Sequence, residues 1–583
     1  MTSSPQSSTA AETTAKKDPP TIKRWVFWPA AIIVIGFAGF AILAPNAADT
    51  AFGAVQSSIV RNFNWYYVLI AAFFVIFSLV MGFGKYGDIK LGKDDDKPEF
   101  SNLSWLSLLF AAGMGIGLVF YGVSEPLSHF IEPKPGVSGT ENQLAQQALS
   151  QTYLHWGVHA WSIYIVLGLA LAYAIHRRGR PVSVRWALEP LLGRRVRGGW
   201  GNLIDIVALV GTIFGVATSL GLGVLQIGSG LEAAGILESS TTSSIAIIAV
   251  ITAFVLFSVI SGVGKGMKWL SNINLVLAGA LLVFILIVGP TQFLLRDFVQ
   301  SLGNYLQNFV SLTFSTSAFS GEAGVDWQSA WTTFYWGWWM SWAPFVGVFI
   351  ARISRGRTVR EFVTGVMLVP TLVTFLWFSV LGGTALYLQL NGVTDFVQSD
   401  GSVDVEGALF QMLAELPGGA ILTIGAIILI AIFFITSADS GALVMGMLAT
   451  GGQVEPKHWV RAFFAIITSL LAVALLLAGG LNALQTAAIS IALPFSIVLL
   501  LSCWATALAF AREKRAYERA RRAALVDHIG DFYGLEVDEP VEREPSRMFP
   551  WLRKTNVMNL PVAGPAPTSQ VPIVTPNTEK PKD

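Results

Sequence analysis

The chain has 583 residues, of which 53% are hydrophobic and only 13% are charged. Soluble proteins carry about a quarter charged residues, so this composition argues against a soluble protein. The 38 basic and 37 acidic residues nearly cancel, to a formal net charge of +1, and no nucleic-acid partner is expected. The single cysteine, Cys503, excludes a disulfide framework and a cysteine-based metal site.

Hydrophobic runs recur along the chain from Trp25 almost to Phe510. Each has roughly 20 residues, which is long enough for a helix to cross ~30 Å of hydrocarbon. The runs predict twelve transmembrane helices near residues 25–45, 64–84, 105–124, 151–175, 203–223, 244–264, 273–295, 329–351, 362–390, 420–449, 460–480 and 485–510. We therefore expect an all-α integral membrane protein.

The basic residues are distributed unevenly between the two sides of the membrane. When the N-terminus is placed in the cytoplasm, only Arg61, Lys134 and Arg296 of the 38 basic residues fall in outside loops. Lysine and arginine accumulate in the cytoplasmic loops of membrane proteins. The distribution therefore predicts a multi-pass protein of the cell membrane with cytoplasmic N- and C-termini.

Three regions follow from composition along the chain. Residues 1–24 predict a disordered cytoplasmic tail, and residues 25–510 predict the twelve-helix membrane domain. In the cytoplasmic region 511–583, residues 511–527 predict a strongly basic helix and residues 535–583 a proline-rich unstructured tail. The basic helix fits either positive-inside topology or contact with anionic membrane lipids in a regulatory sensor.

Two of the predicted spans contain residues that interrupt a helix. The third carries the run Gly113-Met114-Gly115-Ile116-Gly117, and the eighth carries Pro344 after a tryptophan-rich stretch. Backbone at membrane depth must keep its hydrogen bonds, so interrupted spans usually line a site inside the protein. These spans open two equal sets of five helices, 3–7 and 8–12, which is typical of an inverted-repeat transporter. Close helix packing is the alternative explanation for the glycines.

Few ionisable residues lie in or beside the predicted spans. They are Glu125 near an end of the third, His155 and His159 in the fourth, Asp205 at the start of the fifth and Asp439 in the tenth. His155 and His159 share a helix face, but a metal site would need carboxylate or cysteine partners that the sequence does not place beside them. We therefore expect a hydrogen-bonded packing role for both. The sequence also shows no nucleophile paired with a base and no GxxxxGK[ST] phosphate loop, so neither a membrane enzyme nor an ATP-driven pump is expected.

Aromatic side chains supply most of the chemistry inside the membrane. Trp161 and Tyr164 share one face of the fourth helix, and Trp339 and Trp342 share one face of the eighth. A box of aromatic faces binds a trimethylammonium group by cation–π attraction, with about 2 kcal/mol for each desolvated contact. Such a box needs no side-chain anion, which suits a zwitterion. Aromatic belts at the membrane interfaces are the alternative explanation.

Two adjacent hydroxyl groups lie on the tenth helix, at Thr436 and Ser437. Together with carbonyl groups of an unwound helix they would form an uncharged sodium site. Hydrogen bonds from the hydroxyls to their own helix are the alternative.

Four sequence features together resemble the betaine–choline–carnitine transporter family. They are GMGIG at 113–117 followed by Ser124-Glu125-Pro126, the HWxxHxWxIY string that begins at His155, the tryptophan-rich helix 8 that leads into residues 351–357, and ITSADS at 435–440. The resemblance covers roughly residues 25–510. It implies a LeuT-type five-plus-five inverted repeat (helices 3–7 and 8–12), two extra N-terminal helices and a homotrimer.

The resemblance also implies the positions of the binding sites. The substrate box falls on Met114, Gly117, Trp156, Trp161, Tyr164, Trp338, Trp339 and Trp342, with Phe334 as a gating residue. A sodium site falls on the backbone of Ala111, Met114 and Phe433 and on the hydroxyls of Thr436 and Ser437. Thr212 and Phe345 match a possible second sodium site, but Val216 stands where the family has a further threonine, so the number of sodium ions stays open.

Gly117 bears on the choice of substrate, because proton-coupled choline carriers of this family tend to have aspartate at that position. Glycine is similar to the pattern of the sodium-coupled carriers of compatible solutes. The expected function is import of such a solute by sodium symport in osmoprotection, with glycine betaine first and ectoine or proline as alternatives. A choline or carnitine uptake or exchange carrier, proton-coupled or ion-independent, is the second hypothesis. Apart from Na⁺ as coupling ion, no cofactor and no catalytic residue are expected.

Overall fold

The computed structural model describes residues 22–113, 115–261 and 264–533. These residues form helices and no β-strand, with two isolated β-bridges in loops. The α-helices are, in chain order, α1 (Arg24–Leu43), α2 (Pro45–Phe83), α3 (Asn102–Gly113), α4 (Ile116–Ile131), α5 (Glu141–Trp156), α6 (Val158–Ala172), α7 (Glu189–Leu192), α8 (Gly199–Ala233), α9 (Thr241–Ser261), α10 (Gly264–Val288), α11 (Thr291–Thr313), α12 (Gly321–Ala330), α13 (Thr332–Ile353), α14 (Val359–Leu390), α15 (Ala408–Ala414), α16 (Gly419–Ala449) and α17 (His458–Tyr533). The all-α prediction is confirmed for this part of the chain.

Nine helical segments of the described chain are long and apolar enough to cross a membrane. They comprise α1, α2, the α5–α6 segment, α8, α9, α10, α14, α16 and α17. The interrupted pair α3–α4 and the tryptophan-rich α13 are not among them. α17 covers two predicted spans, 460–480 and 485–510, and bends between them at Gly479 and Gly480, the latter with φ 59°.

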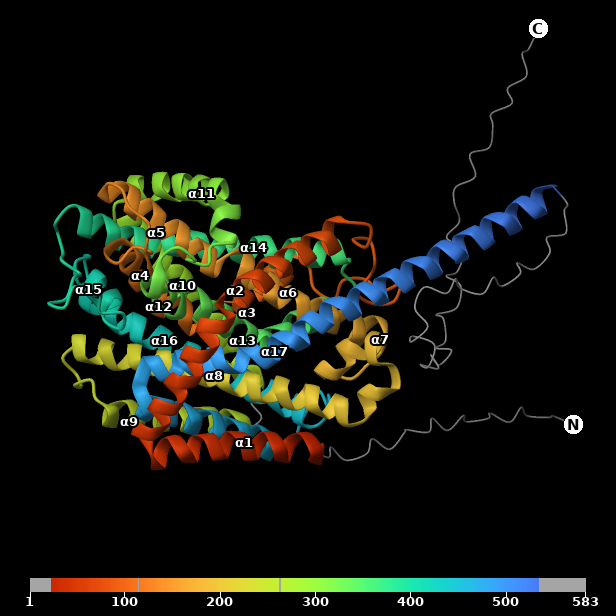
Figure 1. The fold of residues 1–583 in the computed structure, drawn as a ribbon, viewed down its shortest axis with the longest axis horizontal. Helices are drawn as coiled ribbons and strands as arrows, with labels where there is room; N and C mark the ends of the chain where they lie inside the picture. Colours follow the sequence, from red (N-terminus) through yellow and green to blue (C-terminus); the bar gives the residue numbers. More distant parts are fainter. Residues whose placement is uncertain (1–21, 114, 262–263, 534–583) are drawn as a thin grey trace, which may run out of the picture.

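Several helical segments were not predicted from the sequence, among them the short helices α7, α12 and α15 and two longer stretches. α2 begins at Pro45, directly after α1, so residues 45–63 are helical as well as the predicted span. α11 follows α10 and buries Leu294, Ser301 and Tyr305 along one face. It packs against α5 and α14, at one end of the helix bundle in Figure 1.

The predicted interruption of the third span is present. α3 ends at Gly113, and α4 begins at Ile116 after Gly115, whose backbone is extended (φ −131°, ψ −176°). A Cβ atom at Gly115 would lie 3.2 Å from Cη2 of Trp342 in α13. The small residue therefore lets the broken backbone approach the tryptophan-rich helix closely.

The predicted interruption of the eighth span at Pro344 is wrong. α13 runs without a break from Thr332 to Ile353, although Pro344 lacks the N–H of a helical hydrogen bond. Buried transmembrane helices tolerate proline because the surrounding protein supports the freed groups, and here residues 332–348 are buried throughout. The chain breaks instead before the helix, at Trp331 (φ −121°, ψ −87°).

The predicted fourth span, 151–175, is divided at Gly157, which separates α5 from α6 (φ −96°, ψ −130°). A Cβ atom at Gly157 would lie 2.6 Å from Cε1 of Phe375 in α14. α5 also starts earlier than predicted, at a capping box in which Thr140 and Gln143 satisfy each other's backbone N–H groups. The break places Trp156 at the end of one helix and Trp161 in the first turns of the next.

α17 leaves the bundle at its C-terminal end and continues as a helix to Tyr533 (Figure 1). Residues 511–527, which were predicted to be a basic helix, lie within it. The base of this extension is attached to the bundle by Glu513, which accepts hydrogen bonds from Arg177 (2.5 Å from Nη2) and Tyr173 (2.8 Å). The predicted tails 1–24 and 535–583 lie almost wholly outside the described residues.

A buried ion pair fixes the start of α8. The Asp205 carboxylate accepts from Nε of Arg185 at 2.5 Å and from the hydroxyl of Ser183 at 2.7 Å. The Arg185 guanidinium also donates to the Asn202 side chain at 2.9 Å. The exposed fractions of the two charged side chains are 7% for Arg185 and 0% for Asp205.

We predict that Arg185→Leu will lower the free energy of unfolding by about 3–5 kcal/mol, because it leaves the Asp205 carboxylate buried without its cation. The measurement is thermal unfolding of the purified protein in detergent. Arg61→Leu is the matched control, since the side chains of the Arg61–Glu322 pair are 64% and 73% exposed and exposed pairs contribute about 1 kcal/mol or less. Equal losses in the two variants would contradict the assignment of a buried, structure-fixing pair.

Candidate functional site

Aromatic side chains surround a small cavity between α4, α5, α6, α13 and α14. Its lining residues are Leu118, Trp156, Ala160, Trp161, Tyr164, Trp339 and Thr374. The four aromatic residues among them all belong to the predicted substrate box. No lining side chain carries a formal charge, so a cation in this cavity would be held by aromatic faces and hydroxyl groups.

The rings of the cavity are held at defined angles. Trp156 meets Trp339 edge to face, with ring centroids 4.9 Å apart and planes inclined at 70°. Tyr164 packs edge-on against Trp161 at 5.6 Å and against Trp339 at 6.2 Å. Nε1 of Trp339 donates to the carbonyl oxygen of His155 at 2.8 Å. Because the negative potential of an aromatic ring lies on its face, this fixed arrangement provides sites for a positively charged group.

Two further predicted residues, Trp338 and Phe334, lie behind the ring of Trp339 and not at the cavity surface. Trp338 stacks on Trp339 with centroids 4.8 Å apart, and its Nε1 donates to the Ser219 hydroxyl at 3.2 Å. Phe334, the predicted gating residue, stacks on Trp338 at 5.4 Å and is fully buried. Neither Trp338 nor Phe334 lines the cavity.

The other predicted box residues lie near the break between α3 and α4. A Cβ atom at Gly117 would lie 2.4 Å from Cη2 of Trp338 and 2.9 Å from Cη2 of Trp156. Gly117 thus lies directly against both indole rings and leaves no room for a larger side chain in this arrangement. Trp342 is buried against Phe345, with centroids 5.4 Å apart. Met114 lies outside the described residues.

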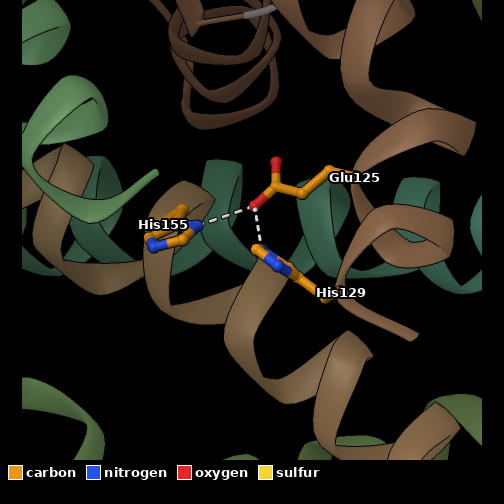
Figure 2. Close-up of side chains that lie close together, drawn as sticks. All are labelled: Glu125, His129 and His155. Carbon is orange, nitrogen blue, oxygen red and sulfur yellow. Dashed lines mark hydrogen bonds and ion pairs between the residues drawn. The ribbon is translucent and has the colours of Figure 1, made fainter. Parts of the chain in front are cut away.

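A buried carboxylate lies behind Trp156. Glu125 of α4 accepts from Nε1 of Trp156 at 2.6 Å and from the Tyr335 hydroxyl, both at Oε2. Its other oxygen, Oε1, lies 2.7 Å from Nδ1 of His155 and 3.3 Å from Nε2 of His129. Figure 2 shows both imidazole rings pointing toward this oxygen, with His155 to its left and His129 below it. Four side chains from α4, α5 and α13 therefore meet at one carboxyl group.

The prediction that His155 lacks a carboxylate partner is wrong, because the break at Gly157 and the packing of α4 on α5 bring Glu125 to it. Glu125 was assigned only to the end of a span, although its i,i+4 spacing to His129 was a signal that the sequence offered. His159 differs from His155. Neither of its ring nitrogens has a partner among the described residues, and its ring stacks on Trp336 at 5.2 Å.

Glu125, His129 and His155 could geometrically hold a metal ion, since one ligand atom from each lies within 4.8 Å of the others. These atoms are already joined by hydrogen bonds within the cluster, and the second carboxylate oxygen is occupied by Trp156 and Tyr335. The carboxyl group is therefore fully engaged by side chains of the protein, while Nδ1 of His129 has no hydrogen-bond partner among the described residues.

The two segments that carry the residues predicted for sodium both contact α8. A Cβ atom at Gly223 of α8 would lie 3.0 Å from Cγ2 of Ile116 at the start of α4 and 3.3 Å from Cδ2 of Phe434 in α16. The break between α3 and α4 and the part of α16 that carries Thr436 therefore contact α8 at the same position, Gly223. The Thr436 hydroxyl donates to Ile432 O at 2.9 Å and lies 3.2 Å from Phe433 O, as the alternative explanation anticipated.

These groups fit an alkali cation chemically. A threonine hydroxyl that donates to its own helix keeps lone pairs for a cation. The last carbonyl groups of a helix, to which Ala111 in α3 belongs, lack partners along the helix. The half-buried Ser437 hydroxyl stands next to Thr436 on α16.

The possible second sodium set lies between α8 and α13. Thr212 is buried and donates to Ala208 O at 2.7 Å, while Phe345 is 8% exposed. A Cβ atom at Gly215 would lie 2.9 Å from Oγ of Ser341, so the two helices are in close contact here. Val216 is buried and lies 3.3 Å from a Cβ atom placed at Gly441 of α16, and it offers no oxygen.

Three lining residues were missed by the sequence analysis, Leu118, Ala160 and Thr374. Ala160 directly precedes Trp161 in α6. Leu118 belongs to the first turn of α4, after the break, and Thr374 lies in the middle of α14. Neither has a local pattern that would mark it, because only the packing of α14 against α4 and α6 brings Thr374 to the cavity. Thr374 adds a second hydroxyl to that of Tyr164.

Comparison with known proteins matches the same part of the chain. The model of the betaine/carnitine/choline family transporters covers residues 25–515. An uncharacterised transporter of Mycobacterium tuberculosis is 48% identical over 515 residues, which are 87% of this chain and 86% of the relative. The glycine betaine transporter OpuD of Bacillus subtilis is 43% identical over 497 residues (85% and 96%), and the glycine betaine transporter of Acinetobacter baylyi is 40% identical over 550 residues (91% and 82%).

A partly buried lysine lies beyond the Glu125 cluster, in the loop after α4. Nζ of Lys134 donates to the Ser315 hydroxyl at 2.7 Å and lies 4.9 Å from the ring centroid of Trp327. Trp327 in turn packs on His129 at 5.4 Å. Burial lowers the pKa of Lys134 from 10.5 to about 8.

We predict that the stability of the folded protein rises with pH between about 8 and 10.5 through Lys134. In this range the unfolded chain holds a proton on Lys134 that the folded protein has lost, so raising the pH favours folding. The measurement is the thermal midpoint across this range, compared with Lys134→Met, in which that rise should disappear. Lys97→Met, at an exposed lysine, should keep it, and a rise that persisted in Lys134→Met would contradict the prediction.

Proposed function

Because the chain belongs to the betaine/carnitine/choline family of transporters, we propose that it imports a zwitterionic quaternary-ammonium solute, glycine betaine first, by sodium symport. Members of this family are transporters, so the chain is a transporter and not an enzyme. Ectoine and proline share the zwitterionic character and are further candidates. Accumulation of such a solute would serve osmoprotection.

The observation that carries the proposal is the uncharged aromatic cavity. Three indoles and a phenol line it, and no lining residue is ionised. A trimethylammonium group cannot donate a hydrogen bond, so aromatic faces are its natural partners. Tyr164 and Thr374 also line the cavity, and each carries a hydroxyl group, the kind of donor that a carboxylate on the same solute needs. The cavity is small, so entry of a substrate requires the rings to move.

The proposed architecture has twelve spans, which adds α3–α4, α13 and the second half of α17 to the nine apolar segments. We place the spans in the cell membrane with both termini in the cytoplasm, as the basic residues indicate. The interrupted α3–α4 segment is the third of these twelve spans. It supports a LeuT-type inverted repeat in which spans 3–7 form one half and spans 8–12 the other. A homotrimer, and contact of the basic end of α17 with membrane lipids, complete the proposal.

Sodium is the proposed coupling ion, held by carbonyl groups at the end of α3, by Phe433 O and by the hydroxyls of Thr436 and Ser437. The meeting of Ile116 and Phe434 on Gly223 supports this set, because it brings α16 to the broken helix. Val216 supports a single ion, since its side chain has no ligand atom.

A choline or carnitine carrier is the second candidate. Choline has no carboxylate, and a carrier for it gains from an acidic group beside the ammonium. Position 117 has no room for an acidic side chain in this structure, because even a Cβ atom there would lie 2.4 Å from Cη2 of Trp338. This contact favours a zwitterion over a simple cation.

Uptake by the purified full-length chain in proteoliposomes tests the function. We predict accumulation of radiolabelled glycine betaine that requires an inward sodium gradient. Ectoine, proline, choline and carnitine serve as parallel substrates. Transport of choline alone, or betaine uptake that is unchanged without sodium, would contradict the proposal.

Two variants test the sites. Trp339→Phe removes one indole face and its hydrogen bond to His155 O, so we predict a rise of about tenfold or more in KM for betaine, as expected for loss of about 1–2 kcal/mol of cation–π attraction. Ser437→Ala should raise the sodium concentration needed for half-maximal uptake. Trp336→Phe and Ser440→Ala on the same helices are the matched controls, and unchanged kinetics in both test variants would overturn the site assignment.

A further inference from the structure

A carboxylate inside a membrane protein usually pairs with a basic residue, but the contacts of Glu125 are of another kind. The side chain is fully buried in α4. Its ion-pair partners among the described residues are the imidazoles His129 and His155, and no lysine or arginine contacts it. The negative charge is thus not neutralised by a permanent cation beside it.

The hydrogen atoms around Glu125 can be assigned from the neighbouring groups. An indole nitrogen only donates, so Nε1 of Trp156 donates to Oε2 at 2.6 Å. Nε2 of His155 lies 3.0 Å from the side-chain amide nitrogen of Gln151, which also only donates. His155 therefore accepts at Nε2 and carries its hydrogen on Nδ1, which donates to Oε1 at 2.7 Å. Such an acceptor set fits an ionised carboxylate.

Trp156 connects this carboxylate to the cavity. Its N–H edge is bonded to Glu125, and the same indole is part of the cavity lining. A hydrogen bond to a carboxylate polarises the donor, which increases the electron density of the indole face. That face is where a cation–π contact gains its energy.

We propose that Glu125 is a positioning and specificity-determining residue of the substrate site. Through Trp156 it fixes the angle of one wall of the cavity and makes that wall more attractive to a positively charged group. The inference rests on the proposed function, since it needs a quaternary ammonium in the cavity. Glu125 is thus a buried anion that influences an uncharged cavity through Trp156, while its carboxylate does not contact the substrate.

The experiment compares a cation with its uncharged counterpart. Glycine betaine and 3,3-dimethylbutanoate have the same shape, but a carbon atom replaces the quaternary nitrogen in the second. Binding of each to the full-length protein in detergent is measured by tryptophan fluorescence, for the wild type and for Glu125→Gln. Glutamine has the shape of glutamate without its charge, and its amide oxygen can accept from Trp156. Its NH2 group then faces Nδ1 of His155, which becomes an acceptor when His155 takes the other tautomer and the Gln151 amide turns its oxygen toward Nε2.

We expect Glu125→Gln to weaken betaine binding about tenfold and binding of the isostere less than about twofold. A purely structural role would weaken both ligands equally. In a Trp156→Phe background, which lacks the connecting N–H, Glu125→Gln should produce no further selective loss. Trp336→Phe is the matched control, because its Nε1 has no partner among the described residues.

An unchanged ratio of betaine to isostere affinity in Glu125→Gln would overturn this inference while leaving the proposed function intact. A selective loss that persists in the Trp156→Phe background would overturn the connection through the indole. Wild-type protein that binds and transports no quaternary-ammonium solute would overturn the proposed function itself, and this inference with it.

Discussion

The structure depends on one constraint, that a polar group inside an apolar helix bundle must find its partners within the protein. Glu125 shows the constraint most clearly, because side chains from three helices supply its hydrogen bonds. The same holds for Asp205, which Arg185 and Ser183 satisfy at the start of α8. In both cases the requirement of one acid determines where several helices lie.

The constraint also decides where helices can stop. α3 ends at Gly113 and α5 ends before Gly157, and both breaks lie against buried aromatic rings and not against lipid. A broken helix exposes carbonyl and N–H groups that are useful only where an ion or substrate can meet them. The aromatic cavity lies between these two breaks, next to Leu118 and Trp156.

Much of this could be predicted from the sequence, because apolar run length and residue type act locally. The described spans, the interruption at 113–116 and the grouping of Trp161, Tyr164 and Trp339 follow from such local signals. The break at Gly157 and the continuity of α13 through Pro344 could not be predicted, since each depends on what packs against the residue. Thr374 and the partners of Glu125 likewise come together only in the folded bundle. The sequence indicates one of the four partners of Glu125, His129, through its i,i+4 spacing. The other three, His155, Trp156 and Tyr335, come from α5 and α13.

The position of Glu125 has a consequence for how the cavity can open. Its hydrogen bonds connect α4, the end of α5 and α13, while Trp339 of α13 bonds the backbone of α5 at His155. Separating these helices would leave a buried charge short of donors, at a cost of about 1–3 kcal/mol for each lost bond. α8 contacts the same helices through fewer hydrogen bonds, from Trp338 to the Ser219 hydroxyl at 3.2 Å and from Gln226 to Val119 O at 3.1 Å. Its contact with α16 at Val216 and Gly441 is apolar. A rearrangement that admits substrate is therefore less costly on the α8 and α16 side than within the Glu125 cluster, and the wall formed by Trp156 and Trp339 can stay intact while the cavity changes its access.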